Sequence, residues 1–319
     1  MTTFAPAPSG PCVVGIGHAS IDHVFEVQAL PAAPLKVPAH AYRVQVGGMT
    51  ANAVVAAARL GARARILAPV GDDGSLGAFR AHFEREGVDA SGLLVVPGAQ
   101  SSVAAVVVDA TGQRLIIGHR GDALSRVPEL PAAALDGADV LLTDPRCPAW
   151  CVRALEVARA RGVLSVLDAD VAPAQDLRQA VSLAAWAVFS EPGLQAFSGP
   201  GCTHEDALRA ALAAGARHAV VTLGERGLLW LEGPGVPQAV LAFAVPQVVD
   251  TTSAGDVFHA ALGCALARGQ GALASLRFAA AAAALKCTRG GGVLAAPTLE
   301  QVQAALSPDR PRPAAPRSP

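Results

Sequence analysis

The chain has 319 residues, of which 52% are hydrophobic and 16% charged, and its 25 basic and 26 acidic residues nearly cancel. This composition allows a large buried core, and a net charge of −1 excludes a general nucleic-acid binder, which needs a basic surface. No apolar run is long enough to span a membrane, and the first eleven residues lack the basic and apolar regions of a secretory signal. We therefore expect a cytoplasmic protein with reduced cysteines, whose spacing also lacks the ligand pairs of a structural zinc site.

The two ends of the chain differ in composition from the rest. Residues 1–10 and 308–319 are rich in proline and polar residues, which predicts disorder because such segments bury too little apolar surface. Residues 11–307 alternate between short apolar runs and segments with helical spacing, beginning with an expected strand from Cys12 to Gly17. Further strands are expected at 64–70, 140–143, 163–167, 186–189 and 219–223, and helices at 51–60, 74–87, 149–160, 174–181, 205–214, 254–268, 272–287 and 299–306. This alternation implies an α/β fold in which helices flank a mostly parallel sheet.

Two pairs of segments depart from that alternation. Residues 103–109 and 114–118 flank Ala110-Thr111-Gly112, which is typical of a hairpin, and residues 228–231 and 239–243 indicate an antiparallel extension of the sheet. Because ligands of parallel sheets bind beyond the carboxyl ends of the strands, functional residues are expected there. Polar clusters follow expected strands at 18–22, 144–146, 168–170, 190–191 and 222–224.

Two nucleotide-binding motifs can be checked directly. A P-loop ends in Gly-Lys followed by Ser or Thr, whereas both lysines, Lys36 and Lys286, follow leucine. The segment Gly15-Ile16-Gly17 has two of the three glycines of a dinucleotide-binding fingerprint, but Asp22 follows far sooner than the acidic residue of that motif. The sequence therefore excludes a P-loop and leaves an NAD-dependent oxidoreductase as an alternative.

The segment most informative for chemistry is Asp250-Thr251-Thr252-Ser253-Ala254-Gly255-Asp256, which leads into an expected helix. Small side chains let backbone amides approach a ligand, and amides at a helix N-terminus favour an anion. Asp256 then lies in the first turn, where its carboxylate can act as the general base for a hydroxyl that attacks a bound phosphate. The alternative is an ordinary helix start, capped by Thr252 or Ser253, with Asp256 complementing the helix dipole.

The stretch from Asp250 to Asp256 resembles the C-terminal signature of the ribokinase (pfkB) family of carbohydrate kinases. The segment from Gly47 to Asn52, followed by Leu60-Gly61 and Val70-Gly71-Asp72-Asp73, resembles the other signature of that family, in the matching order and separation. The resemblance covers about residues 12–306, and the segments 166–170, 189–194 and 284–289 are similar to bacterial sulfofructose kinases within the family. It implies a ribokinase-like sheet with a small β-sheet lid, formed by residues 24–46 and 94–118, which excludes water and serves as a homodimer contact.

The resemblance also implies roles for individual residues. Asp256 is the expected catalytic base, and the amides of Ser253, Ala254 and Gly255 are the expected anion hole. Ser253 stands where the family usually has glycine or alanine, so an ordinary φ is expected there. The expected sugar ligands are Asp22, Gly47, Gly48 and Asn52, and the expected nucleotide-binding residues are Thr222, Gly224, Gly227, Thr288 and Gly291. The residues alone also allow a helix-terminus role for Asn52, a tight turn at 47–48 and a flexible connector at 290–292.

The implied cofactors are ATP and Mg²⁺, with a monovalent cation such as K⁺ at Asp250 and Thr252. The Asn-x-x-Glu motif of the family falls at 190–193, where the asparagine and the final glutamate are both absent. Glu191 is therefore expected to serve Mg²⁺ through water. His259 is expected in the core or behind the base.

The implied function is an ATP-dependent kinase for a primary hydroxyl of a small sugar, at O-1 of an anionic ketose such as 6-deoxy-6-sulfofructose. Arg146 matches an arginine that resembles the sulfonate contact of sulfofructose kinases, and a guanidinium fork suits a three-oxygen anion. The accompanying asparagine is replaced by Gly118, so His119 and Arg120 are expected to compensate. The open alternatives are a surface role for Arg146, a non-catalytic sugar sensor, and kinases for fructose, fructose 6-phosphate, tagatose 6-phosphate, another sugar or a nucleoside.

Overall fold

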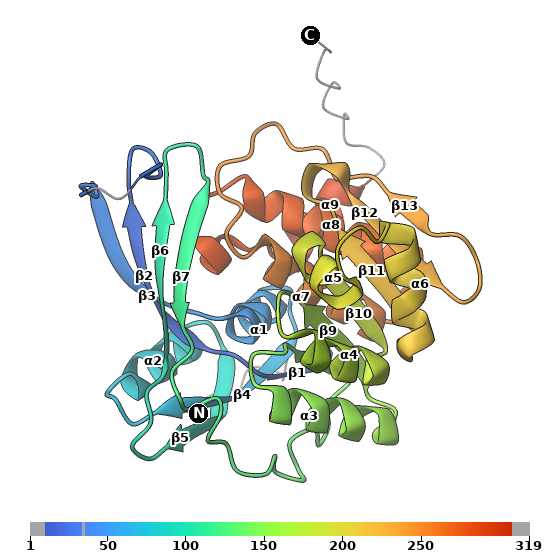
Figure 1. The fold of residues 1–319 in the computed structure, drawn as a ribbon, viewed down its shortest axis with the longest axis horizontal. Helices are drawn as coiled ribbons and strands as arrows, with labels where there is room; N and C mark the ends of the chain where they lie inside the picture. Colours follow the sequence, from blue (N-terminus) through green and yellow to red (C-terminus); the bar gives the residue numbers. More distant parts are fainter. Residues whose placement is uncertain (1–9, 34–35, 308–319) are drawn as a thin grey trace, which may run out of the picture.

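The computed structural model describes residues 10–33 and 36–307. The ends that were expected to be disordered lie outside the described residues, Gly10 apart. The described chain forms two sheets, a large one flanked by helices and a smaller one beside it (Figure 1). Within those residues, no helix combines the length and apolar character needed to cross a membrane.

The large sheet confirms the expected alternation of strands and helices. Its spatial order is β13-β12-β11-β10-β9-β8-β1-β4-β5, and only the pairings of β12 with β11 and with β13 are antiparallel. The strands are β1 (Cys12–Ile16), β4 (Arg63–Gly71), β5 (Val88–Val96), β8 (Val140–Thr143), β9 (Leu164–Ala169), β10 (Trp186–Ser190), β11 (His218–Thr222), β12 (Leu228–Glu232) and β13 (Gln238–Val240).

The helices cover both faces of this sheet. One face carries α1 (Met49–Arg59), α2 (Leu76–Arg85), α7 (Ala254–Ala267), α8 (Ala272–Cys287) and α9 (Leu299–Leu306). The other carries α3 (Pro148–Arg161), α4 (Ala174–Leu183), α5 (Glu191–Ser198) and α6 (His204–Ala214). Short 3₁₀ turns occupy Gly224–Arg226 and Gly292–Ala295.

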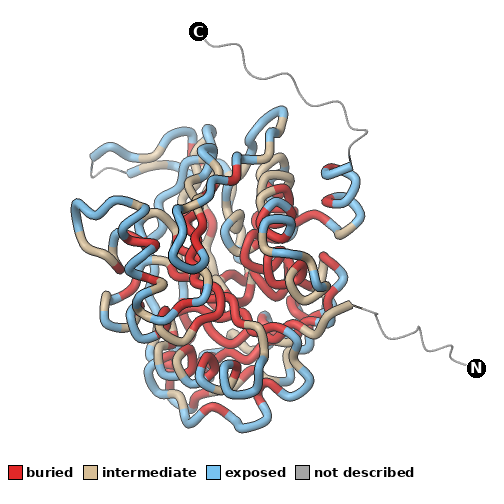
Figure 2. The backbone as a smooth tube through the Cα atoms, turned by 90° about the vertical axis from the view of Figure 1, so that its right-hand side faces the viewer, coloured by how far each residue is buried: buried red, intermediate tan, exposed pale blue. Residues whose placement is uncertain are grey.

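Two apolar cores result, because successive strand residues point to opposite faces. Val13 packs with α1 and α7, whereas Val14 packs with α3. Figure 2 shows the buried residues concentrated in the middle of the molecule. Helix α5 was not expected from the sequence, because Pro192 and Gly193 interrupt its helical pattern. Its first turn is stabilised by Ser190, whose hydroxyl accepts a hydrogen bond from the Gly193 amide.

The small sheet is the expected lid, with different boundaries. Its order is β3-β2-β6-β7, formed by β2 (Ser20–Glu26), β3 (Ala41–Gly47), β6 (Ser102–Val108) and β7 (Arg114–His119). The bounds that we expected for the lid segments, 24–46 and 94–118, were therefore partly wrong. The lid already begins at residue 20, which pairs with both β3 and β6. Residues 94–96 belong to β5, where they pair with β4 of the large sheet and bury Val96.

Candidate active site

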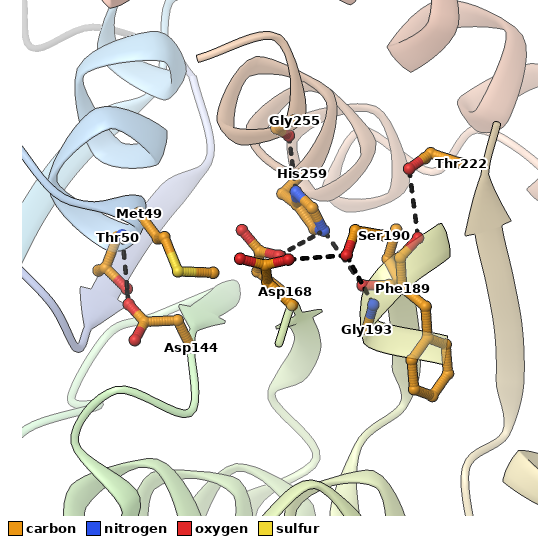
Figure 3. A network of polar contacts seen from close by, with 12 residues as sticks. Met49, Thr50, Asp144, Asp168, Phe189, Ser190, Gly193, Thr222, Gly255 and His259 are labelled. Carbon is orange, nitrogen blue, oxygen red and sulfur yellow. Dashed lines mark hydrogen bonds and ion pairs between the residues drawn. The ribbon is translucent and has the colours of Figure 1, made fainter. Parts of the chain in front are cut away.

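The turn at Gly47-Gly48 joins the lid to the large sheet. Gly48 precedes α1 with φ of +103°, and a Cβ there would overlap the backbone of His18 and Ala19, so this position requires glycine. Asp144, just beyond β8, anchors the turn through one carboxylate oxygen. That oxygen accepts the His18 amide at 2.9 Å. It also accepts the Thr50 amide at 3.3 Å and the Thr50 hydroxyl, and Figure 3 shows Thr50 beside Asp144.

The expected base lies in the first turn of α7, against a residue from the other signature. The Asn52 side-chain amide donates to Asp256 Oδ2 at 2.8 Å and to Ser253 Oγ at 3.1 Å. Burial raises the pKa of Asp256 to about 7, and the nearby Asp168 carboxyl adds to the rise. A carboxylate with this pKa is suited to accept a proton near neutral pH.

The backbone of Ser253 differs from the expectation. Its φ is +61°, and it is the one non-glycine residue with positive φ among those that the structure describes. The left-handed conformation costs an L-residue about 1–2 kcal/mol. The hydrogen bond from Asn52 to its hydroxyl helps to hold this conformation. The chain thereby turns into α7 with Ala254 and Gly255 as its first helical residues.

His259 lies behind the base, as expected, and contacts a carboxyl that the sequence did not assign. Its Nδ1 is 2.6 Å from the Gly255 carbonyl oxygen, and its Nε2 is 3.5 Å from Asp168 Oδ1 (Figure 3). Burial lowers the pKa of His259 and raises that of Asp168 well above its usual range. The Nε2 atom also lies 3.4 Å from the Val188 carbonyl oxygen, so the imidazole ring links the first turn of α7 to β9 and β10.

Asp22 is the expected sugar ligand at the lid. The Ser20 hydroxyl donates to Asp22 Oδ1 at 2.7 Å, and burial raises the pKa of the Asp22 carboxyl. A Cβ at Gly47 would overlap this carboxylate, so the close approach requires glycine. A cavity of about 320 Å³ lies between the lid and the segments 249–252 and 290–292. Asp22 lines this cavity, whereas Asp256 does not.

Arg146 lies beside the glycine turn but is already paired. Its Nη2 is 3.1 Å from Asp170 Oδ2, its Nη1 donates to the Val171 carbonyl at 3.0 Å, and its Nε approaches Met49 Sδ at 3.4 Å. His119 and Arg120 are exposed, at and just after the end of β7. The structure thus places Arg146 at the carboxyl edge of the large sheet, just after β8.

The expected nucleotide-binding residues follow β11 and α8. Thr222 ends β11, Gly224 and Gly227 bound the following 3₁₀ turn with φ of +60° and +84°, and a Cβ at Gly227 would overlap the Val240 carbonyl. Thr288 is the C-cap of α8, and Gly291 precedes the second 3₁₀ turn with φ of +108°.

Glu191, the expected Mg²⁺ residue, is engaged in ion pairs. Its oxygens lie 2.7 and 2.8 Å from Arg226 Nη2, and its Oε1 lies 3.1 Å from His204 Nε2. No cluster of three or more His, Cys, Asp or Glu side chains suited to a metal ion occurs in the part of the chain that the structure describes.

Asp250 and Thr252, the expected cation site, do lie together, but next to a buried lysine. Asp250 Oδ1 accepts the Thr252 amide at 2.8 Å, and Lys286 Nζ lies 3.0 Å from Asp250 Oδ2. Although burial opposes it, the hydrogen bonds from Thr252 and the Lys286 charge lower the pKa of Asp250 to about 2. The sequence signal for Lys286 was its rarity, since the chain has only two lysines.

An α/β sheet with the buried Asp256 carboxyl at a helix N-terminus and a small second sheet beside it is the arrangement that we expected of a carbohydrate kinase. The sequence matches the pfkB family of carbohydrate kinases over residues 12–299, and the chain belongs to that family. It is 30% identical over 297 residues to the ribokinase of Bacillus subtilis, covering 92% of this chain and 98% of that protein. It is 28% identical over 316 residues to fructokinase-1 of Zea mays, covering 91% and 96%. Ribokinase from Thermotoga maritima has a similar structure, with a TM-score of 0.79, 28% identity and coverage of 93% and 99%.

Proposed function

We propose that this chain is an ATP-dependent kinase that phosphorylates a primary hydroxyl of a small sugar, at O-1 of an anionic ketose such as 6-deoxy-6-sulfofructose. The observation that carries the kinase proposal is Asp256, held by Asn52 in the first turn of α7 beside the small residues 253–255. A non-catalytic sensor has no need of a carboxylate with a raised pKa at this place.

The chemistry follows from this arrangement. The substrate hydroxyl gives its proton to Asp256 as its oxygen forms a bond to the γ-phosphorus, and the bond between that phosphorus and the leaving ADP oxygen breaks. The amides of Ser253 and Gly255, at the positive end of the α7 dipole, stabilise the transferring phosphoryl group. The third expected donor, the Ala254 amide, already donates to the Thr251 carbonyl oxygen at 3.2 Å. The lid excludes water, which would otherwise compete as the acceptor.

ATP is proposed to lie along Thr222, Gly224 and Gly227, with its base near Thr288 and Gly291. The described residues fit Mg²⁺ only as an ion carried by the nucleotide phosphates, which it usually contacts in kinases. When bound, Mg²⁺ neutralises charge on those phosphates. Glu191 would contribute through water only after its pairs with Arg226 and His204 open.

The anionic substrate is proposed from Arg146. Its Nε approaches Met49, the residue after the Gly47-Gly48 turn, so the guanidinium borders the proposed sugar site. Its partner Asp170 accepts the Ser190 hydroxyl at 2.7 Å through the other carboxylate oxygen, so a bound anion would share the Arg146 guanidinium with Asp170 Oδ2. Fructose, fructose 6-phosphate, tagatose 6-phosphate and nucleosides are the alternatives that the substrate experiment separates.

We also propose that two chains dimerise through the outer face of the lid. The strand register places Val44, His23, Ala105 and Ile117 in one row across the sheet, and Tyr42, Phe25, Val107 and Leu115 in the next. Tyr42, Val44 and Ile117 are 56%, 52% and 64% exposed, which is a large apolar area for a free surface. A second copy of the same face can cover it.

The experiment that tests the proposed function is a panel of sugars and nucleosides incubated with ATP and Mg²⁺, read by ADP release. We expect turnover with ketoses, fastest with an anionic one, and none in the Asp256→Asn variant. Reduction of a nicotinamide cofactor, or no ADP release with any sugar, would contradict the kinase assignment.

A further inference from the structure

Lys286 is a charged side chain in the interior of the protein. It lies near the end of α8, and its side chain has no exposed surface. Its Nζ donates to the Asp250 carbonyl oxygen at 2.7 Å and lies 3.0 Å from Asp250 Oδ2. A buried ammonium is costly unless oxygen atoms surround it, so its position in contact with two oxygens of one residue indicates a specific role.

The segment that Lys286 holds leads directly to the anion hole. The amides of Val249 and Asp250 both donate to the Cys287 carbonyl, at 2.7 and 3.1 Å. Asp250 then fixes its neighbours, because its carboxylate accepts the amides of Thr252 and of Gly292. The Ala254 amide donates to the Thr251 carbonyl at 3.2 Å as the chain enters α7. Residues 249–252 are thus ordered around a positive charge that is covalently part of the chain.

A monovalent cation was expected at this place, and the residues present do not fit one. Such an ion would need the Asp250 oxygens, and both carboxylate oxygens and the carbonyl oxygen already accept hydrogen bonds. An ion bound beside Nζ would also face a like charge at short distance, in a region where water screens poorly. The ammonium supplies the same charge and contacts the same oxygen atoms.

The residue type supports this role. All but two of the 25 basic residues are arginines, and the other lysine, Lys36, is exposed. A guanidinium is a broad planar fork, whereas an ammonium is a compact point charge comparable in shape to a small monovalent ion. A lysine in a chain that otherwise uses arginine therefore matches a site that accepts only a compact cation.

We propose that the Lys286 ammonium permanently takes the place of a monovalent cation beside the anion hole, so that this enzyme needs no K⁺. The inference rests on the proposed kinase function for its activity readout only, because it also predicts how K⁺ affects stability.

The first test uses the wild-type protein. Kinase activity and the melting temperature are measured in K⁺ and in N-methyl-D-glucamine, a cation too large for the site, at equal ionic strength. We expect the melting temperature to be the same in the two salts and the two rates to agree within about twofold. Activation by K⁺ of about fivefold or more, the usual onset of real coupling between sites, or a K⁺-specific rise in melting temperature would overturn the proposal.

The second test uses two substitutions that differ in the space they leave. Lys286→Ala opens room for an ion, whereas Lys286→Met fills the same volume without charge. We expect both variants to lose activity and melting temperature in N-methyl-D-glucamine, and K⁺ or NH₄⁺ to restore Lys286→Ala but not Lys286→Met. Lys36→Ala is the matched control and should behave as wild type in every salt. Full activity of Lys286→Ala without K⁺ would contradict the proposal.

These readouts separate the two proposals. Should no sugar be phosphorylated, the proposed function fails, and the melting temperatures in the two salts still test the cation replacement. Should Lys286→Ala fail to fold in any salt, the wild-type comparison alone decides.

Discussion

Asp256 shows how distant residues set the properties of a single carboxyl group. Burial and Asp168 raise its pKa, while the Asn52 amide and the Ser253 hydroxyl lower it through hydrogen bonds. Asn52 comes from α1 and Asp168 from β9, so the resulting pKa of about 7 depends on the tertiary fold. This balance has consequences for the rate and for its pH dependence.

The first prediction concerns the base itself. Asp256→Asn cannot accept the hydroxyl proton, so kcat should fall by about 10²–10⁴, while ATP and sugar still bind. In the wild-type enzyme the carboxylate is the active form, so kcat/KM should rise with pH through about 7 and level off above it. Steady-state kinetics across pH and calorimetric binding to the variant check both points. A near-wild-type kcat in Asp256→Asn would contradict the assignment.

The second prediction concerns the charge of the substrate. Arg146→Ala should raise the KM for an anionic ketose by up to about 100-fold, because a charge-assisted hydrogen-bonded pair is lost. The KM for fructose should hardly change. Arg146→Lys should recover part of the loss, because an ammonium lacks the guanidinium fork. The test compares kcat/KM for sulfofructose, fructose 6-phosphate and fructose.

A control for this prediction follows from the ion pair with Asp170. Removing Arg146 leaves that carboxylate unpaired, and its repulsion would add to the loss for an anion. The double variant Arg146→Ala, Asp170→Asn removes the repulsion and isolates the direct contact. If fructose is the best substrate and Arg146→Ala does not affect it, the anionic-ketose proposal is wrong, whereas the kinase proposal stands.

The start of α1 is the element on which the sugar site depends most directly. Gly48 precedes this helix with φ of +103°, Asp144 fixes its first turn, and Asn52 projects from it toward the base. Any shift of this turn would therefore displace the proposed sugar ligands Gly47 and Gly48 together with Asn52, the partner of Asp256.

The third prediction compares a glycine that precedes a helix, Gly48, with one inside a helix, Gly77. Gly48→Ala should destabilise the protein by about 1–3 kcal/mol, because of its backbone conformation and its overlap with His18. Gly77→Ala in α2 should stabilise it by about 0.5–1 kcal/mol, because this glycine is helical and faces open space. Chemical denaturation of both variants checks the opposite signs. Equal effects would show that the turn tolerates a side chain.

At the scale of elements, the sequence predicted the strands and helices that follow from local patterns of apolar residues. Apolar spacing, together with glycines and prolines between segments, predicted most of the strands and helices in their order, and α8 and α9 have the expected bounds. The sequence did not predict β5 or α5. The start of the lid at Ser20 was missed, because β2 opens with polar residues whose partners lie on β3 and β6. The signatures indicated Asp256 and Asn52. The clusters after the strands included Asp144 and Asp168, but the partners of these two residues and of Lys286 lie far away in the sequence, so no local pattern reveals them.

At the scale of the whole molecule, the two faces of the lid differ in character. The inner face carries Asp22, Arg43 and Gln45 toward the cavity, and a Cβ at Gly292 would lie 3.6 Å from the Gln45 amide nitrogen. The outer face is mainly apolar, and all six residues of β7 are exposed. An edge strand of this kind, left open, invites pairing with another chain.

The last prediction therefore concerns the oligomer. If the outer lid face is a homodimer contact, the wild-type protein should have twice the 32.1 kDa mass of the chain by light scattering. Ile117→Lys should convert it to the monomer, because a charge would be buried at the centre of the contact. Leu241→Lys changes a residue just after β13 that is even more exposed, 84% against 64% for Ile117, and it should leave the mass unchanged. The same sheet carries Asp22 on its inner face. In the Ile117→Lys monomer, the KM for the sugar should therefore rise over its wild-type value by a larger factor than the KM for ATP. A wild-type monomer at all concentrations would refute the dimer, and a dimer with unchanged mass in Ile117→Lys would place the contact elsewhere.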